Sequence, residues 1–206
     1  MKVLLINGSP HEKGCTYTAL SLIAGELKAQ GIETEILHVG GQPVGGCIGC
    51  GGCAKGNGCV FGGVVNEAIE KAKTADGFVF GSPVHYASAA GNMASFMDRL
   101  AYAGGKYLAY KPAAICCSAR RAGTTSTLDQ LVKYPQFFHM PLVNGSYWAM
   151  VHGSNPEQVL QDAEGCAVMQ ELGRNMAWLL RCIEAGKAAG IDHPQNPPRP
   201  MTNFIH

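Results

Sequence analysis

A short apolar segment at the start of the chain runs directly into a turn, and this pairing constrains the fold more than any other feature. Residues 2–7 (KVLLIN) are rich in Leu and β-branched residues, and the Gly-Ser-Pro triplet at 8–10 ends them. Such a run is typical of a strand buried on both faces of a parallel sheet. Residues 16–30 then carry apolar side chains at helical spacing up to Gly31. We therefore expect a parallel strand, a loop and a crossover helix.

The alternation of strand and helix continues for most of the chain. Further strands are predicted at 32–39, 77–81, 112–118 and within 137–147, and helices at 65–73, around 93–100 and at 128–134. Strands separated by helices in this way pair in parallel through helical crossovers. The pattern predicts an α/β fold: a flavodoxin-like, doubly wound sheet of five parallel strands with helices on both faces.

The last part of the chain predicts a long helix followed by a tail. Residues 157–186 carry an apolar stripe, which indicates a helix that packs on the sheet or at a subunit interface. Four prolines follow Ile191 and argue against a helix there. We expect one domain over residues 1–190 and a proline-rich C-terminal tail over residues 191–206.

Charge and composition exclude several classes of function. The chain has 16 Lys and Arg against 15 Asp and Glu, and this net charge of +1 argues against nucleic acid as a partner. No apolar run approaches the roughly 18 residues of a membrane span, and no secretory signal follows Met1. With nine cysteines, we expect a cytoplasmic protein whose thiols are reduced. Only 15% of residues are charged, which indicates that another subunit covers some of the surface.

The loop after the first strand has the chemistry of a phosphate site. It offers hydroxyls at Ser9, Thr16 and Thr18, glycines that allow close backbone approach, and the N-terminus of the following helix. It matches neither the dinucleotide fingerprint nor the Walker loop, which disfavours nucleoside triphosphate hydrolysis. The alternative is an ordinary connection rich in Gly and Ser.

Two later loops are expected at the same edge of the sheet, because the carboxyl ends of parallel strands lie together. The loop at 82–91 presents His85 and Tyr86, and the loop at 118–125 adds hydroxyls and two guanidinium groups. With the loop at 8–16, they suit a planar, phosphorylated ligand. The alternative for His85 and Tyr86 is a surface turn with a packed aromatic ring.

These loops and several later segments resemble the flavodoxin-like family of NAD(P)H-dependent FMN reductases. The matching motifs run from Asn7 to Thr16, Gly81 to Tyr86, Asn92 to Arg99, Ser118 to Gly123, Asn144 to Gly153 and Arg174 to Leu180. The resemblance implies FMN as the cofactor, held at its phosphate, along its ring and at its polar edge by three groups of residues. These are Ser9, Cys15, Thr16 and Thr18, then Pro83, Val84, His85 and Tyr86, then Ser118, Arg120 and Gly123.

The resemblance also implies an activity. The family takes a hydride from NADH or NADPH onto the flavin and passes electrons to a quinone, a flavin or another small acceptor. We expect FMN rather than FAD, no side chain that acts as an acid or base, and a homodimer or homotetramer. Tyr147, Trp148 or the tail would then reach a neighbour's flavin. A non-catalytic FMN-binding protein is the weaker alternative.

Two positions depart from the family pattern. Cys15 stands where the family usually has Asn or Ser, and a thiol is a weaker hydrogen-bond partner. We interpret this thiol as inert rather than reactive. Gly62 and Gly63 stand where relatives commonly carry an acidic residue, so any role of that carboxylate is absent.

Four cysteines share one glycine-rich loop with the spacing C-x2-C-x2-C-x5-C: Cys47, Cys50, Cys53 and Cys59. The spacing resembles the compact motif of iron–sulfur flavoproteins, in which a [4Fe-4S] cluster would make the protein an electron carrier. Zinc fits this spacing less well. We favour a loop of redox-active or structural thiols, because the proline that often follows the last cluster ligand is missing. The cysteines of a predicted strand and helix are expected to pack in the core: Cys116, Cys117, Cys166 and Cys182.

Overall fold

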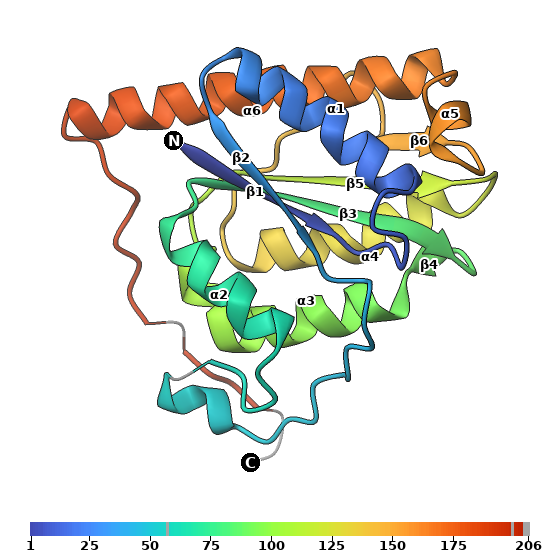
Figure 1. The fold of residues 1–206 in the computed structure, drawn as a ribbon. Coiled ribbons are helices and arrows are strands. Elements are labelled where there is room, and N and C mark those ends of the chain that lie inside the picture. Colours follow the sequence, from blue (N-terminus) through green and yellow to red (C-terminus); the bar gives the residue numbers. More distant parts are fainter. Residues whose placement is uncertain (57, 199, 204–206) are drawn as a thin grey trace.

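The computed structural model describes residues 1–56, 58–198 and 200–203, and a single sheet forms its centre (Figure 1). The strands are β1 (Lys2–Asn7), β2 (Glu33–His38), β3 (Gly77–His85), β4 (Ser88–Ala89), β5 (Ala113–Ala119) and β6 (Met150–His152). Five of them are parallel in the order β2-β1-β3-β5-β6, and β4 pairs antiparallel with β3. The predicted flavodoxin-like α/β sheet is confirmed, with six strands rather than five.

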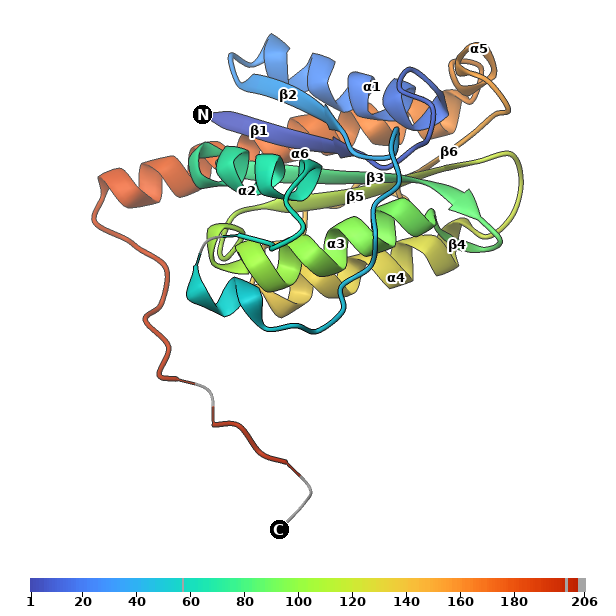
Figure 2. The ribbon, with the colours of Figure 1, turned by 60° about the horizontal axis from the view of Figure 1, so that its bottom comes forward.

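Helices cover both faces of the sheet (Figures 1 and 2). On one face lie α1 (Cys15–Ala29) and α6 (Ala163–Ala188). The other face carries α2 (Val64–Thr74), α3 (Gly91–Gly104) and α4 (Thr124–Phe137). Three shorter elements complete the fold: η1 (Gly52–Lys55), η2 (Gly105–Tyr107) and α5 (Pro156–Val159).

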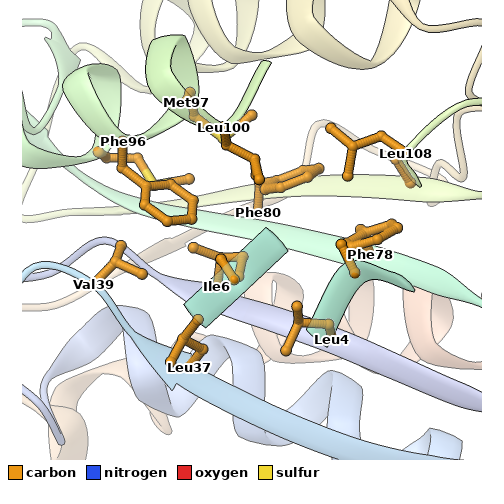
Figure 3. Close-up of a cluster of buried hydrophobic side chains, with 14 of the residues drawn as sticks. Leu4, Ile6, Leu37, Val39, Phe78, Phe80, Phe96, Met97, Leu100 and Leu108 are labelled. Carbon is orange, nitrogen blue, oxygen red and sulfur yellow. The ribbon is translucent and has the colours of Figure 1, made fainter. Parts of the chain in front are cut away.

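Alternation along β1 sends its side chains to two separate cores. Leu4 and Ile6 pack with Phe80 on the side of α2, α3 and α4, and Figure 3 shows this cluster. Val3 and Leu5 pack on the opposite side, against α1 and α6. All five are almost completely buried, and each contributes roughly 1.5–3 kcal/mol of hydrophobic stabilisation. Apolar packing therefore holds the sheet that positions the loops.

The last parallel strand begins later than the sequence predicted. Within the predicted segment 137–147 only Leu142 pairs with β5, through an isolated bridge, and the strand itself is β6. At both ends of this stretch the backbone still bonds to β5, through Val143 and Ala149. Only in its middle does it bond to side chains of α6. The N–H of Ser146 donates to a carboxylate oxygen of Glu171 at 2.7 Å. The apolar pattern alone did not predict this contact with a side chain of α6.

The predicted helix at 157–186 is two helices, each with its own cap. The side-chain oxygen of Asn155 accepts the N–H of Gln158 at 2.9 Å and begins α5. A carboxylate oxygen of Asp162 accepts the N–H of Gly165 at 3.0 Å and begins α6. Asn and Asp are strong N-caps, so the break follows from two side chains that the apolar stripe concealed.

The cysteines outside the glycine-rich loop differ in burial. Cys116 and Cys117 are buried in β5, as predicted. Burial raises the pKa of the Cys117 thiol to about 12 and raises that of Cys116 as well, so both stay protonated. Cys166 is only half-buried, and Cys182 is exposed. The prediction of core packing is therefore wrong for Cys182, which lies on the solvent side of α6.

The tail has neither helix nor strand over its described residues, 191–198 and 200–203. Tyr110 fastens it to the domain, because the tyrosine ring stacks between His139 and His193 with centroid separations of 5.3 and 4.4 Å. The side-chain amide of Asn196 also donates to the Tyr110 hydroxyl at 2.6 Å. Across the part of the chain that the structure describes, the helices are all too short or too polar to cross a membrane.

Candidate functional site

The loop after β1 is shaped by the residue that ends the strand. The side-chain oxygen of Asn7 accepts the N–H of Ser9 at 3.1 Å, and its amide donates to the carbonyl of Glu12 at 2.9 Å. The N–H of His11 donates to the hydroxyl oxygen of Ser9 at 3.1 Å. An Asn that bonds its own backbone two residues later forms a stable turn. The loop is therefore folded into an arch before α1 begins.

A histidine of the neighbouring strand supports this arch from the side. His38, the last residue of β2, lies opposite Asn7 in the register of the sheet. Its Nε2 bonds to the carbonyl oxygen of Ser9 at 2.7 Å. Because a carbonyl only accepts, Nε2 carries the hydrogen. The loop is thus tied to the end of two strands, β1 and β2.

The N-terminus of α1 is open to an anion. Gly14 is its N-cap and has no side chain to cap the N–H groups of the first turn. The first N–H groups of a helix lack helical partners and carry the positive end of its dipole. A helix start of this kind binds phosphate readily.

Cys15, the first residue of α1, has a protonated thiol. Its Sγ donates to the carbonyl of Gly153 at 3.5 Å, which ties the start of α1 to the segment after β6. Burial raises the pKa of the Cys15 thiol above its ordinary value. A thiol that stays neutral at physiological pH is a poor nucleophile, which agrees with an inert interpretation.

The hydroxyls of Thr16 and Thr18, which were predicted to bind phosphate, form hydrogen bonds within the protein. Thr16 and Ser118 are both buried, and their hydroxyl oxygens lie 2.9 Å apart. This hydrogen bond joins the first loop to the end of β5. The hydroxyl of Thr18 donates to the carbonyl of Gly14 at 3.2 Å, within α1. Of the predicted phosphate residues, Thr16 thus links two loops, and Thr18 stabilises the helix start.

The second and third loops are built against each other. Tyr86 and Ala87, at the tip of the second loop, have φ angles of +50° and +59°. Gly123 has a φ of +94°, and a Cβ at this position would lie 2.6 Å from the Cα of Ala87. The hydroxyl of Ser126 donates to the carbonyl of Ala87 at 2.7 Å. The close approach of the two loops therefore requires glycine at position 123.

The predicted flavin-facing side chains differ in exposure. Pro83 and Val84 are half-buried where β3 leaves the sheet, whereas His85 and Arg120 are exposed. Tyr86 is fully exposed, at 105% of its reference area. The proposed phosphate residues are thus anchored in the fold, and the residues expected along the ring project from its edge.

The cysteine loop, residues 45–62, forms a second candidate site. Its four cysteines all line one cavity of about 220 Å³, together with Phe61, Arg99 and Tyr102. We call this cavity the cysteine pocket. Each of the nine cysteines is a free thiol, and all nine lie among the described residues. The loop therefore places four thiols around one space with no disulfide between them.

Side chains of α2 and α3 hold the cysteine loop in place. The side chain of Asn66 bonds both backbone groups of Cys59: its oxygen accepts the N–H at 2.8 Å, and its amide donates to the carbonyl at 3.0 Å. The Nε of Arg99 donates to Sγ of Cys59 at 3.2 Å. Asn92 holds the segment before the loop, with its oxygen accepting the N–H of Val44 at 3.2 Å. Cys59 is thus fixed through both its backbone and its sulfur.

The pocket differs from a site for a single metal ion. Over residues 1–56, 58–198 and 200–203, no three His, Cys, Asp or Glu side chains converge closely enough to hold one ion. The four cysteines instead line one cavity. Iron–sulfur clusters are bound by sets of four cysteine thiolates, and this pocket is lined by four cysteines.

The sequence carries a family signature over most of its length. The model of the NADPH-dependent FMN reductase family matches residues 1–155. The chain belongs to this family. It is therefore a flavoprotein of the FMN-dependent oxidoreductases, as the loop motifs predicted.

Curated relatives of the chain are named as iron–sulfur flavoproteins. One from Methanocaldococcus jannaschii is 28% identical over 192 residues, which cover 89% of this chain and 100% of that protein. One from Archaeoglobus fulgidus is 36% identical over 99 residues, 48% of each chain. One from Methanosarcina thermophila is 22% identical and covers 91% of this chain.

Solved structures show the same fold at lower identity. A flavone reductase aligns with a TM-score of 0.66 and 18% identity, covering 89% of this chain and 64% of its own. A flavodoxin from the domain Archaea aligns with a TM-score of 0.60 and 13% identity, covering 88% of this chain and 99% of its own. These structures confirm the flavodoxin-like fold of this member of the FMN reductase family.

The residues that hold the loops of this FMN reductase family member had no role predicted from the sequence. Asn7 was part of a motif but had no assigned role, and His38, Asn66 and Arg99 were not assigned to either site. A charged residue on the apolar side of a predicted helix was the available signal for Arg99, since Met93, Phe96, Met97 and Leu100 surround it in the sequence. The others become visible only when distant segments are brought together.

Proposed function

We propose that the protein is an FMN-dependent oxidoreductase that uses NADH or NADPH and reduces a quinone, a flavin or another small acceptor. The observation that carries this proposal is the open N-terminus of α1, beside the arch of Asn7, Ser9 and His38. An anion-binding helix start at the carboxyl edge of a parallel sheet suits the phosphate of FMN. The family to which the chain belongs supports the same cofactor.

Each loop has a distinct task under this proposal. The arch and the first N–H groups of α1 would bind the phosphate, with the Ser9 hydroxyl beside them. Pro83 and Val84 would lie along the flavin ring, with His85 and Tyr86 projecting beyond it. Ser118 and Gly123 would shape its polar edge, and Ser118 is already fixed by its bond to Thr16. Arg120, exposed at this edge, would meet charged or polar groups of the ligand.

The bound flavin would supply the chemistry, since it accepts a hydride with its two electrons from NAD(P)H and delivers both electrons to the acceptor. The protein's part is to hold the cofactor and expose one face of it. The exposed loop at Tyr86 leaves room for a nicotinamide or an acceptor to approach. We name no side chain as an acid or base.

The absorbance spectrum of the isolated protein tests this function. A flavin spectrum that is bleached by NADPH or NADH without oxygen, and restored by a quinone, is the expected result. Acid-released flavin should be FMN on chromatography, because the chain has no second nucleotide-binding fingerprint. A protein that binds no flavin, or whose bound flavin neither nucleotide reduces, would contradict the proposal.

A second function is favoured by the cysteine pocket. We propose that Cys47, Cys50, Cys53 and Cys59 hold a [4Fe-4S] cluster, as in an iron–sulfur flavoprotein. The four thiols surround one cavity, and Gly49, Gly51, Gly56 and Gly58 adopt positive φ angles that let the loop turn around it. Curated relatives carry the name of iron–sulfur flavoprotein. These observations now weigh against the simple thiol loop that the sequence favoured.

Such a cluster would let the flavin exchange single electrons with a carrier protein. Anaerobic purification followed by iron and sulfide analysis tests it. About four irons and four sulfides per chain are expected for a [4Fe-4S] cluster. Carefully anaerobic, reconstituted protein with no bound iron would exclude this second function and leave the first one intact.

We also propose that the protein is a homodimer or homotetramer. Tyr147 and Trp148 are exposed at the edge of the sheet, beside a cavity of about 540 Å³. Trp178 and Leu160 are exposed on the side of α6 and the turn before it. Adjacent exposed apolar side chains, such as the Tyr147 and Trp148 rings in edge contact, mark protein contacts. Light scattering at micromolar concentration should give twice or four times the mass of one chain, and a single-chain mass would contradict the proposal.

A further inference from the structure

Arg99 carries a formal charge into the interior of the domain. Among the residues that the structure describes, it is the only charged side chain in the buried class, with 6% of its area exposed. It lies on α3, between apolar residues that pack against the sheet. A guanidinium stays protonated under all physiological conditions, so the charge is permanent.

All the polar contacts of this guanidinium are with the cysteine loop. Its Nε donates to Sγ of Cys59 at 3.2 Å, one terminal nitrogen donates to the carbonyl of Gly45 at 3.4 Å, and the other to that of Gly62 at 3.0 Å. The ring of Phe61 lies over it, with its centroid 5.5 Å from Cζ. Arg99 therefore joins both ends of the loop and reaches the wall of the cysteine pocket.

The charge has no anionic partner within the described chain. No carboxylate of the described residues lies within ion-pair distance of Arg99. The adjacent carboxylate, Asp98, instead accepts the hydroxyl of Tyr134 at 2.6 Å. A buried cation with only carbonyl and sulfur partners is unfavourable, because its lost hydration is not balanced by an opposite charge. The pocket that it faces is lined by four thiols, which become anionic when they bind iron.

We propose that Arg99 is a positioning residue that supplies the counter-charge of the iron–sulfur cluster and raises its reduction potential. This inference rests on the second function proposed above, a cluster on the four cysteines. Thiolate ligation gives such a group a net negative charge, and its potential depends on net charge, hydrogen bonds to the sulfurs and solvent exposure. Arg99 acts on the first two, since it is a cation and donates to the sulfur of Cys59.

The direction of the effect follows from electrostatics. Reduction of the cluster adds one electron, and so one negative charge, next to the guanidinium. The cation stabilises this reduced form more than the oxidised form. Removing the charge and the hydrogen bond must therefore shift the midpoint potential to a more negative value.

A purely mechanical role for Arg99 is the rival explanation, because the side chain also closes the loop between Gly45 and Gly62. Two variants separate the roles. Arg99→Lys keeps the charge with fewer donors, and Arg99→Gln keeps a donor and loses the charge. Arg181→Gln is the matched control: Arg181 is an exposed arginine of α6 that donates to the carbonyl of Gln30 at 2.9 Å.

The experiment uses the full chain, purified and reconstituted with iron and sulfide without oxygen. Iron content is measured first, and a redox titration with dithionite then gives the midpoint potentials of cluster and flavin by electron paramagnetic resonance and absorbance. Arg99→Gln should hold iron and show a more negative cluster midpoint than the wild type. Arg99→Lys should lie between the two, and Arg181→Gln should match the wild type. The flavin midpoint is the internal reference and should change least.

Three outcomes would overturn the inference. Cluster midpoints that are equal in wild type, Arg99→Lys and Arg99→Gln would exclude a role for the charge. Loss of iron from both Arg99 variants, with FMN retained, would show that Arg99 only closes the loop. A wild-type protein that takes up no iron would remove the cluster itself, and this result is visible before any variant is made.

Discussion

The flavin loops and the cysteine loop of this protein are shaped in different ways. The flavin loops are short and begin where strands end, so the sheet places them, and hydrogen bonds such as that between Thr16 and Ser118 connect them. The cysteine loop is long and glycine-rich, and it follows β2 without a partner strand. It depends on side chains from α2 and α3, above all Asn66 and Arg99.

This difference separates two kinds of ligand site. A loop fixed by strand ends keeps its shape whether or not the ligand is bound, because its supports belong to the core. A loop held by a few side chains, with five glycines at positive φ between positions 49 and 62, has more conformational freedom to lose. We infer that a bound group would stabilise the cysteine loop more than FMN stabilises the flavin loops. The figures place the loop's helix η1 beside α3, apart from the strand ends.

Cys50→Ser should produce the largest difference between the cysteine loop and the flavin loops. If the cysteine pocket holds a cluster, this change should remove essentially all bound iron from anaerobic protein and leave the FMN content unchanged, because serine oxygen is a poor ligand for iron–sulfur clusters. Iron analysis and the flavin spectrum measure the two effects separately. Cys182→Ser, on the exposed side of α6, is the control and should retain both.

An unchanged iron content in Cys50→Ser would show that the four thiols do not act as one ligand set. Loss of both iron and FMN would contradict the independence of the two regions. The second result would require a closer coupling between the flavin loops and the cysteine loop than their separate hydrogen bonds indicate.

The second prediction tests the close packing of two flavin loops, the one that contains Ala87 and the one that contains Gly123. Gly123→Ala places a Cβ at a φ of +94° and 2.6 Å from the Cα of Ala87. Backbone strain of this kind costs about 1–3 kcal/mol, and the loop at 86–87 must also move. We expect a lower free energy of unfolding in urea and weaker FMN binding, with iron content unaffected.

Gly25→Ala is the matched control for this change. Gly25 lies in α1, and a Cβ there meets nothing within 4 Å. Replacing a helical glycine by alanine should stabilise the protein by roughly 0.5–1 kcal/mol. If Gly123→Ala were as stable as Gly25→Ala, the tight approach of the second and third loops would be unimportant.

Periodicity predicted most of the fold because the physical cause of each strand is local. The apolar run of β1 and the breaker after it lie within ten residues, and so do those of β5. The errors arose where a single distant side chain decided the outcome. Glu171 of α6 accepts the backbone N–H of Ser146, and Asp162 starts a new helix inside an apolar stripe.

In the candidate sites, too, the features with a local cause were predicted and those set by distant side chains were not. Loop motifs placed Ser9, Thr16 and Ser118 near one edge of the sheet, because parallel strands bring their carboxyl ends together. Cysteine spacing brought the four thiols of the loop into one hypothesis, and the structure places all four around one cavity. The side chains that hold the loops could not be predicted, because His38 bonds to Ser9, 29 positions away, and Arg99 bonds to Cys59, 40 positions away.

The last prediction concerns the phosphate end of the flavin site. Ser9→Ala combined with Thr16→Val removes two hydroxyls, and valine keeps the methyl group of Thr16 that lies against Gly81. Each lost hydrogen bond to a charged phosphate should cost roughly 1.5–3 kcal/mol, about tenfold to a hundredfold in FMN affinity. Quenching of FMN fluorescence on titration measures this. Thr18→Ala should have less effect, because its hydroxyl already donates to Gly14. Equal FMN affinity in the double variant and the wild type would show that backbone N–H groups alone bind the phosphate, and the open start of α1 would then be the whole anion site.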